Sequence, residues 1–356
     1  MPEALESDDM SLHEPPTESP ERLAYYDRIR GDNLAPLWQV FSTLITKEPK
    51  SDCRAHIWRY EMLRDRLMEA GNLISAKEAE RRVLILENPG FAGEARITTS
   101  LFSGLQLVLP GEVAPAHRHS QSALRFIVEG SSGQTAVDGE RTIMEEGDFV
   151  ITPPWSWHDH GNYTDAPMIW LDGLDFPLVR FIDASFAEGY PADQQPITIP
   201  DGDSGARYGA NMLPVDYRSS SPVSPLFAYP YARTREALEA MKQRDEWDPC
   251  HGLKMRYTNP NDGGHAMPTI GAFIQLLPKG FTSKRYRSTD ATVFVCVEGE
   301  GKTRIGRTHL EWGPRDIFVA PSWHPVVHEA SAESVLFSFS DRPVQEKLGL
   351  RREKRG

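Results

Sequence analysis

The stretch "LQLVLPGEVAPAHRHSQSALRFIVEG", residues 105–130, decides the fold because the chain contains a second version of it. That version is "IQLLPKGFTSKRYRSTDATVFVCVEG", residues 274–299, which lies at a constant offset of 169 residues (274 minus 105). Further along, "GDFVITPPWSWHDH" (147–160) aligns with "RDIFVAPSWHPVVH" (315–328) at an offset one residue shorter. Both versions consist of short apolar runs broken by Gly, Pro and Asp, which is typical of strands. The sequence therefore predicts a tandem duplication of one strand-rich unit.

Two other segments lie outside the repeated units, one before the first unit and one between the two. Residues 21–79 carry apolar residues at three- and four-residue spacing, as in "RYEMLRDRLMEAG", which is typical of amphipathic helices. Residues 184–250 are a polar, proline-rich connection in which "TREALEAMKQRDEW" favours one helix. The sequence predicts five parts: a mobile acidic arm over 1–20, an N-terminal helical region over 21–90, a first strand-rich domain over 91–183, a linker with a helix over 184–250 and a second strand-rich domain over 251–345.

Composition limits the classes of partner. The formal net charge of the 356-residue chain is −12, which disfavours binding to nucleic acid and to anionic membranes. No run of 18 apolar residues predicts a membrane span, and "MPEALESDDMSLHEPPTESPE" lacks the pattern of a signal peptide. Cys53, Cys250 and Cys296 are far apart, which argues against a disulfide framework. We expect a cytoplasmic protein in which any anionic substrate meets a local cluster of positive charge.

The duplication provides an internal control for function. Features present in both halves are best explained by the shared fold, whereas features present in one half are candidates for chemistry. Three histidines of the first half have no histidine counterpart: His117, His119 and His158 align with Tyr286, Ser288 and Val326. The first half is therefore predicted to carry the functional site.

These three histidines predict a metal site. Alternate residues of a strand share one face, so His117 and His119 can direct two imidazoles at one point. His158 follows about 40 residues later, and a hairpin-built sheet can bring it alongside. Three imidazoles suit a divalent transition metal such as iron, zinc or nickel and leave open positions for other ligands. The alternative is a set of ordinary surface or hydrogen-bonded histidines.

The spacing of these residues resembles the two sequence motifs of the cupin superfamily. The matching positions are Gly111, His117, His119 and Gly130 for the first motif, and Gly147, Pro153, His158 and Asn162 for the second. The resemblance implies a mainly β fold, a bicupin of two tandem double-stranded β-helix (jelly-roll) barrels with an N-terminal helical region. Two positions depart from the motifs: Trp155 replaces a usual glycine, and Ala123 replaces a usual glutamate ligand.

Arg125 is the candidate for carboxylate recognition. If residues 123–129 form a strand, Arg125 shares a face with Ala123 and points toward the metal-bearing interior. The second half has Phe294 at the equivalent position. A guanidinium matches the geometry of a carboxylate, so a cation in the first half only suits an anionic substrate. The alternative is an arginine paired with an acid at the rim of the barrel.

Longer blocks resemble the gentisate 1,2-dioxygenase family, which includes salicylate and 1-hydroxy-2-naphthoate dioxygenases. These blocks are "AERRVLILENPG", "HRHSQSALRFIVEG", "VDGERTIMEEGDFVITPPWSWHDHGN", "WLDGLDFP" and "YTNPNDGGHAMPT". The resemblance implies a non-haem Fe(II) enzyme that opens an aromatic hydroxy-acid with both atoms of O2. It also implies cleavage between the carboxyl-bearing carbon and the adjacent hydroxylated carbon, which gives maleylpyruvate from gentisate, and a homo-oligomer, specifically a homotetramer.

The same resemblance implies roles for eight residues. His117, His119 and His158 are the implied iron ligands, Arg81, Gln106, Arg125 and His160 the implied substrate contacts, and His160, Arg125 and Asp172 the implied catalytic residues. His160 is expected to titrate near neutrality and to take up a substrate proton.

Each role has a structural alternative. Arg81 follows an acid-rich segment and could be solvated, and Asp172 could cap a turn. Gln106 and His160 have counterparts, Gln275 and His328, which favours a structural role for both.

Several functions remain open at this point. Salicylate or 1-hydroxy-2-naphthoate could replace gentisate, and Phe102 is one pocket position that does not discriminate among these rings. A manganese-dependent decarboxylase of oxalate type would keep ligands in both halves, which the residues opposite the histidines disfavour. A non-catalytic storage or ligand-binding bicupin would need no complete ligand set and no inward arginine.

Overall fold

The computed structural model describes residues 18–219 and 221–356, and the chain divides into two compact units, residues 1–50 and 51–356. Most of the predicted acidic arm, residues 1–17, lies outside the described residues. In the first unit, α1 (Pro20–Gly31) begins after Ser19, whose hydroxyl accepts a hydrogen bond from the backbone N–H of Arg22. A second helix, α2 (Leu37–Leu44), follows.

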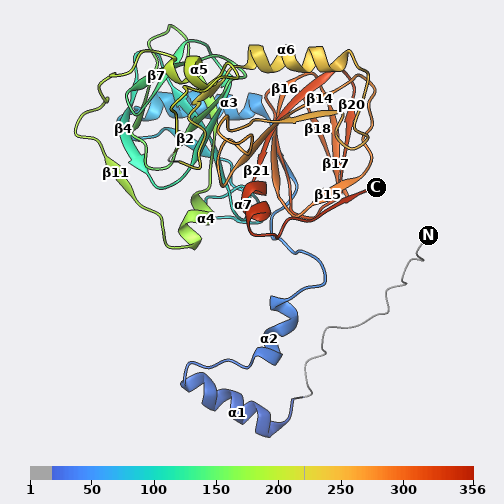
Figure 1. Ribbon diagram of the computed structural model, residues 1–356. Helices are drawn as coiled ribbons and strands as arrows, with labels where there is room; N and C mark the ends of the chain where they lie inside the picture. The colour runs from blue at the N-terminus through green and yellow to red at the C-terminus, as the bar shows by residue number, and fades with distance from the viewer. Residues whose placement is uncertain (1–17, 220) are drawn as a thin grey trace. The chain divides into compact units, whose positions relative to one another are not determined.

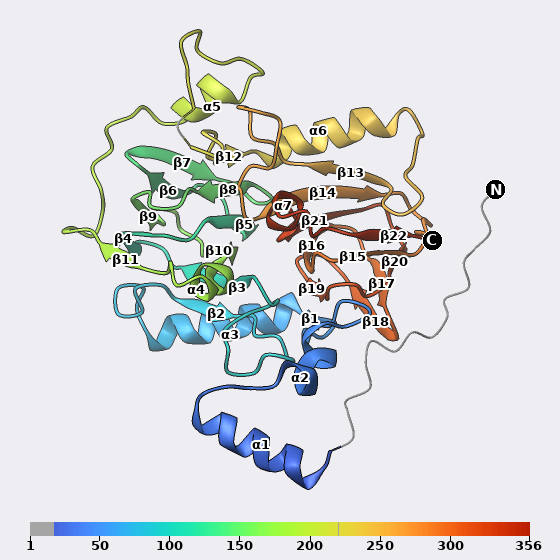
Figure 2. The same ribbon diagram turned by 60° about the horizontal axis from the view of Figure 1, so that its bottom comes forward.

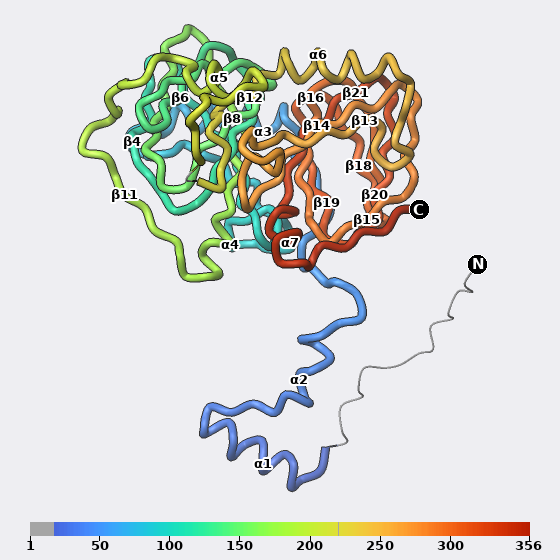
Figure 3. The backbone as a smooth tube through the Cα atoms, viewed as in Figure 1, coloured from blue at the N-terminus to red at the C-terminus, as the bar shows by residue number. Residues whose placement is uncertain are grey.

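The second unit contains two barrels, each built from a six-stranded and a five-stranded sheet, and they lie side by side (Figures 1 and 3). The first barrel comprises the sheets β12-β8-β5-β10-β3-β2 and β11-β4-β9-β6-β7. Its strands are β2 (Val83–Ile85), β3 (Phe102–Val108), β4 (Val113–His119), β5 (Ala123–Glu129), β6 (Gly133–Val137), β7 (Glu140–Met144), β8 (Phe149–Thr152), β9 (His158–Gly161), β10 (Met168–Leu174), β11 (Ala187–Gly189) and β12 (Ala228–Tyr229).

The second barrel comprises the sheets β1-β19-β16-β21-β14-β13 and β18-β17-β20-β15-β22. Its strands are β1 (His56–Trp58), β13 (Leu253–Arg256), β14 (Gly271–Leu277), β15 (Tyr286–Ser288), β16 (Thr292–Glu298), β17 (Gly301–Ile305), β18 (Thr308–Trp312), β19 (Ile317–Ala320), β20 (Val326–Ala330), β21 (Ser334–Ser340) and β22 (Glu353–Arg355). Helices α3 (Tyr60–Leu73), α4 (Phe176–Phe181), α5 (Asp203–Tyr208), α6 (Tyr231–Lys242) and α7 (Arg342–Lys347) cover or connect the barrels.

The strand bounds confirm the duplication and the mainly β fold. Strands β3 and β5 begin and end 169 residues before β14 and β16. The pairs β6 and β17, β7 and β18, and β8 and β19 are offset by 168 residues. The one-residue change therefore falls in the turn between β5 and β6, where a turn absorbs it without shifting either strand to its other face.

The segments outside the repeat donate edge strands. β1 pairs with β19 of the second barrel, whereas β2 pairs with β3 of the first, so the region predicted as helical contributes a strand to each barrel. Between them, α3 packs against β3 (Figure 2). From the linker, β12 pairs with β8 of the first barrel. Strands of two or three residues show no alternation of apolar and polar residues, which is why the helical pattern concealed them.

One hydrophobic core joins the two barrels. Phe126 of the first barrel stacks on Phe337 of the second, with ring centroids 4.2 Å apart and an interplanar angle of 17°. Both rings belong to a buried cluster that also contains Leu105, Leu171 and Val293. The six-stranded sheets thus bury one face against each other, as two-layer packing requires.

Tryptophan occupies a left-handed backbone position in both barrels. Trp155 and Trp323 each have φ of 63°, and their backbone N–H groups donate to the carbonyls of His119 and Ser288 at 2.7 Å. This is the cupin glycine position that the sequence fills with tryptophan. Because the feature occurs in both halves, it belongs to the fold. Among the described residues, no helix has the length and apolarity that crossing a bilayer requires.

Candidate metal and substrate site

Strands β4 and β9 bring the three predicted ligands together. His117 pairs directly with His158 across the two strands, and His119 lies two residues further on the same face. One ligand atom from each histidine lies within 4.8 Å of the others, and this is the one such group of three among the described residues. The three rings can therefore share one ion.

Backbone carbonyls set the orientation of two of these rings. Nδ1 of His119 lies 3.0 Å from the carbonyl oxygen of Gln121, and Nδ1 of His158 lies 3.0 Å from that of Ser156. A carbonyl only accepts, so each Nδ1 carries the proton and each Nε2 keeps a lone pair. Nε2 of His158 is buried and has no partner among the described residues. This tautomer is the one that a metal ligand needs.

His117 is held differently. Nη2 of Arg81 lies 2.7 Å from Nδ1 of His117 and 2.8 Å from the carbonyl of Pro115. A guanidinium only donates, so Nδ1 accepts in this arrangement and the proton of the neutral ring is on Nε2. To offer Nε2 to a metal, His117 would exchange this hydrogen bond. Arg81 is therefore tied to a ligand histidine, and its reading as a solvated residue is wrong.

The three imidazoles are neutral. Burial, with Arg81 nearby, lowers the pKa of His117 to about 2, and burial, with Arg125 nearby, lowers the pKa of His119 to about 4. Burial also lowers the pKa of His158 well below its usual range. Neutral imidazoles keep the lone pairs that bind a cation.

The histidines line a cavity of about 480 Å³. Its other polar lining groups include Arg81, Gln106, Arg125 and Asp172, and its apolar wall comprises Val83, Ile85, Phe102, Leu174, Phe176 and Phe186. The cavity is large enough for a single aromatic ring with its substituents. Seven of the eight predicted residues therefore line this one cavity.

Arg125 lies where the strand periodicity predicts it. It sits on β5 with Ala123, and only 4% of its surface is exposed. Its Nη1 donates to the hydroxyl of Thr152 at 2.5 Å, and its Nε lies 3.6 Å from Oδ1 of Asp172. The predicted alternative of an acid partner is therefore present in part, but the pair is buried in the cavity wall and not at an exposed rim.

Asp172 lies in the middle of β10, directly opposite Arg125, so the turn-cap alternative is wrong. The indole N–H of Trp170 donates to Oδ1 of Asp172 at 3.0 Å. Burial raises the pKa of Asp172 to about 6, although Arg125 opposes the shift. Trp170 and Thr152 are polar partners that sequence reasoning missed: Trp170 lies two residues from Asp172 on β10, Thr152 lies on the neighbouring β8, and an apolar strand pattern signals neither hydrogen bond.

His160 is the one predicted residue that does not line the cavity. It is fully buried, its ring centroid lies 5.8 Å from that of His158, and Trp170 packs against it edge-on. Neither ring nitrogen has a partner among the described residues. Burial lowers its pKa well below the usual range, so the expectation that it titrates near neutrality is wrong for this structure.

The equivalent histidines His160 and His328 differ between the two barrels, whereas the equivalent glutamines Gln106 and Gln275 do not. His328, the counterpart of His160, has its Nδ1 2.8 Å from the hydroxyl of Thr303, which also accepts from Trp312. His160 lacks any such bond, so the two histidines differ in role. Gln106 and Gln275 are alike, because both are buried with amide atoms that lack partners in the described part of the chain.

The segment after β10 forms the rim of the cavity. β11 pairs with β4 beside His117 and His119, and Phe186 packs on Trp155 with ring centroids 4.4 Å apart. Phe176 and Phe186 line the cavity but were not predicted. Phe176 begins the short helix α4 and Phe186 lies in the polar linker, and no periodic pattern marks a pocket residue in either segment.

Comparison with known proteins places this site in a family. A family model described as "Cupin domain" matches residues 104–173, which contain all three histidines. The chain is 63% identical to gentisate 1,2 dioxygenase 1 of Aquipseudomonas alcaligenes over 97% of this chain and 100% of that protein. This chain belongs to the gentisate 1,2-dioxygenase family.

Two further proteins of the gentisate 1,2-dioxygenase family are similar to this chain over most of its length. Gentisate 1,2-dioxygenase of a Streptomyces species is 38% identical over 93% of this chain and 94% of its own length. Salicylate 1,2-dioxygenase of Pseudoaminobacter salicylatoxidans, solved as an adduct with gentisate, superposes with a TM-score of 0.89 at 34% identity, covering 98% of this chain and 96% of that one. The family confirms a bicupin that is a ring-cleaving dioxygenase, so the decarboxylase and non-catalytic readings are not favoured.

Proposed function

We propose that this chain is an Fe(II)-dependent gentisate 1,2-dioxygenase. It would cleave gentisate between the carboxyl-bearing carbon and the adjacent hydroxylated carbon, and both atoms of O2 would enter the product, maleylpyruvate. The observation that carries the proposal is the combination, in one cavity, of three neutral imidazoles and two inward guanidinium groups against an apolar wall. The 63% identity to a gentisate 1,2 dioxygenase supports gentisate over salicylate or 1-hydroxy-2-naphthoate.

The donor set fits iron. His117, His119 and His158 would hold Fe(II), and the carbonyl contacts of two of them leave Nε2 free for that purpose. Bound Fe(II) would supply the redox chemistry that allows O2 to react with an aromatic ring. Ala123 stands where a carboxylate ligand would otherwise be, so no acid occupies that ligand position to offset the charge of the ion. An anionic substrate would do so instead.

Two guanidinium groups would orient the substrate. Arg125 is fixed by Thr152 and Asp172, which leaves its remaining N–H groups directed at the cavity. Arg81 lies beside His117 on the same wall, and both arginines line the cavity. Charge-assisted hydrogen bonds to the substrate carboxylate would hold the ring in one orientation relative to the histidines. Phe102 and Phe176 would exclude water around it.

His160, Gln106 and Asp172 complete the proposed machinery. His160 is neutral and neither of its ring nitrogens has a partner in the described part of the chain, so one nitrogen can accept a hydrogen bond from a substrate hydroxyl that comes within reach. Gln106 has an unpartnered amide nitrogen that can donate to a substrate oxygen. Asp172 would act on catalysis through Arg125, whose orientation it holds. A cytoplasmic homotetramer remains the prediction for location and assembly.

Oxygen uptake tests the proposal. The purified protein would be loaded anaerobically with Fe(II) and then mixed with O2 and gentisate, salicylate or 1-hydroxy-2-naphthoate in separate cells. Equimolar uptake of O2 and gentisate, with little uptake for the other two acids, is the expected result. Preference for a monohydroxylated acid would contradict the substrate, and no uptake with any acid would contradict the reaction.

The His119→Ala variant tests the ligand set. Loss of one of three ligands should reduce both bound iron and ring cleavage to background, measured by metal analysis of the purified protein and by oxygen uptake. His309→Ala is the matched control, because His309 is exposed on β18 of the second barrel. Full activity in His119→Ala would contradict the assignment.

A further inference from the structure

The second barrel contains a small cavity at the position equivalent to the candidate metal site. Tyr286, Ser288 and Val326, which align with the three histidines, all line it. Its volume is about 30 Å³. A space of this size holds one or two water molecules or a single small ion, and it is too small for an aromatic acid.

Lys254 points a cation at this cavity. It lies on β13 directly opposite Gln275, as Val83 on β2 lies opposite Gln106 in the first barrel. Its Nζ is 5.1 Å from the ring centroid of Phe273 and 5.9 Å from that of Phe294. The barrel that has no histidine at the three aligned ligand positions therefore has a lysine in its cavity wall.

Among the described residues, Lys254 has no hydrogen-bond acceptor, and no carboxylate oxygen lies within 4.0 Å of its Nζ. The neighbouring acid, Asp290, also lines the cavity: its Oδ2 accepts from Ser340 at 2.8 Å and from Nε of Arg342 at 3.2 Å, and its buried Oδ1 has no hydrogen-bond partner in the described part of the chain. Arg351 lies 3.8 Å from Oδ1 of the same carboxylate. One buried carboxylate therefore faces two arginines, and Lys254 contacts the rings of Phe273 and Phe294 but forms no ion pair with a carboxylate of the described chain.

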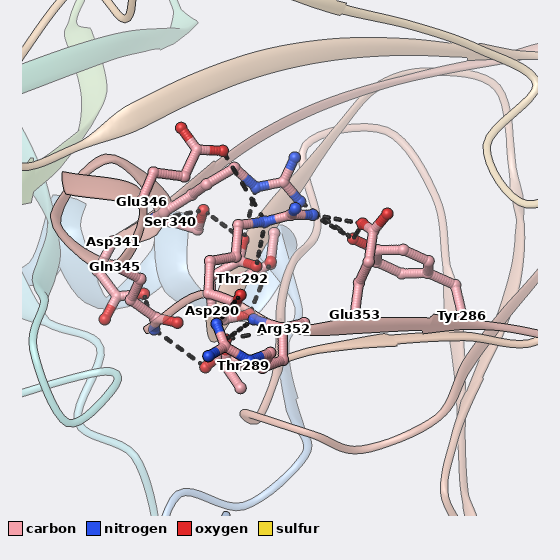
Figure 4. Close-up of polar contacts among 12 residues, drawn as sticks. Tyr286, Thr289, Asp290, Thr292, Ser340, Asp341, Gln345, Glu346, Arg352 and Glu353 are labelled. Carbon is pink, nitrogen blue, oxygen red and sulfur yellow. Dashed lines mark hydrogen bonds and ion pairs between the residues drawn. The ribbon is translucent and has the colours of Figure 1, made fainter. Parts of the chain in front are cut away.

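The other acid nearby is also paired. Glu353 accepts from the hydroxyl of Tyr286 at 2.9 Å and forms an ion pair with Arg351. Figure 4 shows Tyr286 and Glu353 together on one side of Asp290, with Ser340 and Glu346 on the other. The cavity lining contains three cations, Lys254, Arg287 and Arg342, and one acid, Asp290, so the cavity has an excess of positive charge.

A second observation points to a missing ligand. Gln275 is fully buried, and neither its amide nitrogen nor its amide oxygen has a partner among the described residues. The same is true of the hydroxyl of Ser338, which lies on β21 two residues before Ser340. Neither residue lines the cavity, but Gln275 lies opposite Lys254 across β13 and β14, and buried polar groups without partners ordinarily mark the place of an ordered water or ion.

We propose that the cavity of the second barrel binds one small monovalent anion of halide size, held by the ammonium group of Lys254. The first barrel would carry its positive charge as a metal ion, whereas the second carries it as a lysine, and each would attract an anion of the size its cavity admits. The ammonium group of the half-buried Lys254 has no carboxylate partner among the described residues, so a bound anion would stabilise the second barrel. Without a counter-ion, burial and the nearby Arg342 lower the pKa of Lys254 to about 7.

Bromide identifies the site directly. Crystals of the full-length iron-loaded protein would be soaked in sodium bromide, and diffraction would be measured at the bromine absorption edge. The expected result is an anomalous peak inside the second barrel within contact distance of Nζ of Lys254. Absence of anomalous density in this cavity, at a bromide concentration that labels other sites, would overturn the proposal.

Thermal unfolding tests the same site in solution. The unfolding midpoint would be compared in sodium chloride and in sodium gluconate at equal ionic strength, because gluconate is too large for the cavity. A saturable upward shift in chloride is expected for the wild type and for the control Lys279→Met, whose lysine is exposed. The shift should be lost in Lys254→Met. A shift that persists in Lys254→Met, or equal midpoints of the wild type in both salts, would refute the anion site.

Discussion

Equivalent side chains of the two barrels differ in whether their polar atoms have partners. His328 is bonded to Thr303, whereas both ring nitrogens of His160 lack partners within the described chain. Unpartnered buried groups are destabilising, and they persist where a ligand completes them. The first barrel thus keeps its free polar groups beside the substrate cavity, and the second uses the equivalent histidine for its own structure.

Replacing Arg125 by methionine should weaken capture of carboxylated substrates. A hydrogen bond to a charged group contributes about 1.5–3 kcal/mol, so KM for gentisate should rise on the order of 10- to 100-fold. Iron content should not change, because Arg125 is not a ligand. Arg118→Met is the control, since Arg118 lies between two ligand histidines but stacks outward on Trp155 at 4.4 Å. Steady-state kinetics with an unchanged KM would return Arg125 to a purely structural role.

The buried histidines of the second barrel should make stability depend on pH. Burial lowers the pKa of His328 to about 3, so the folded protein leaves it neutral while the unfolded chain protonates it below about pH 6.5. The unfolded state then binds more protons, and the free energy of unfolding falls by about 1.4 kcal/mol per pH unit for each such histidine as pH decreases.

The His328→Asn variant lacks one of the side chains that the unfolded chain protonates in this pH range. Between pH 6 and pH 4, urea unfolding of His328→Asn should therefore show a pH slope shallower by about 1.4 kcal/mol per unit than the wild type, whatever its overall stability. Because the comparison is between slopes, a general loss of packing in the variant does not affect it. Equal slopes would show that His328 is not held neutral.

Both barrels contain the same left-handed turn at a tryptophan. Trp155 and Trp323 occupy a left-handed turn before the strands β9 and β20, and Arg118 and Arg287 stack on them at 4.4 and 4.5 Å. The backbone of each tryptophan bonds the strand that carries, in the first barrel, the ligand histidines. The turn therefore positions β4 relative to β9 in one barrel and the equivalent strands in the other.

Substitutions at Trp323 separate its side chain from its backbone. Trp323→Ala should lose the stack on Arg287 and keep the left-handed strain, whereas Trp323→Gly should lose the same stack but relax the strain. A left-handed non-glycine residue costs roughly 1–2 kcal/mol, so the glycine variant should be more stable than the alanine variant by about 1 kcal/mol. Chemical denaturation of the two variants measures this difference, and equal stabilities would contradict the strained turn.

At the scale of the compact unit 51–356, the two barrels are joined by one core. Phe126 and Phe337 stack across the contact between the six-stranded sheets, and strands from outside each repeat complete the sheet edges. The second barrel, which lacks the three histidines, is therefore still needed by the barrel that has them.

Phe337→Ala should destabilise both barrels together. Truncation of a buried phenylalanine costs about 3–5 kcal/mol. Because the core is shared, loss of oxygen uptake on heating, which reports the first barrel, should shift to lower temperature together with loss of circular dichroism. Phe318→Ala is the comparison, since Phe318 packs within the second barrel's own interior cluster. If Phe337→Ala shifted the dichroism signal while activity kept its wild-type midpoint, the barrels would be independent.

The sequence by itself determined the duplicated mainly β fold, the strand face shared by His117 and His119, and the asymmetry between the halves. These follow from spacing along the chain, because side chains alternate on a strand and aligned repeats share a fold. The tertiary structure alone decided which groups Arg81, Arg125 and His160 contact, that β1 and β2 complete different barrels, and that Lys254 lines a small cavity. Those features depend on residues that pair across sheets, and periodicity along one strand contains no information about its neighbour.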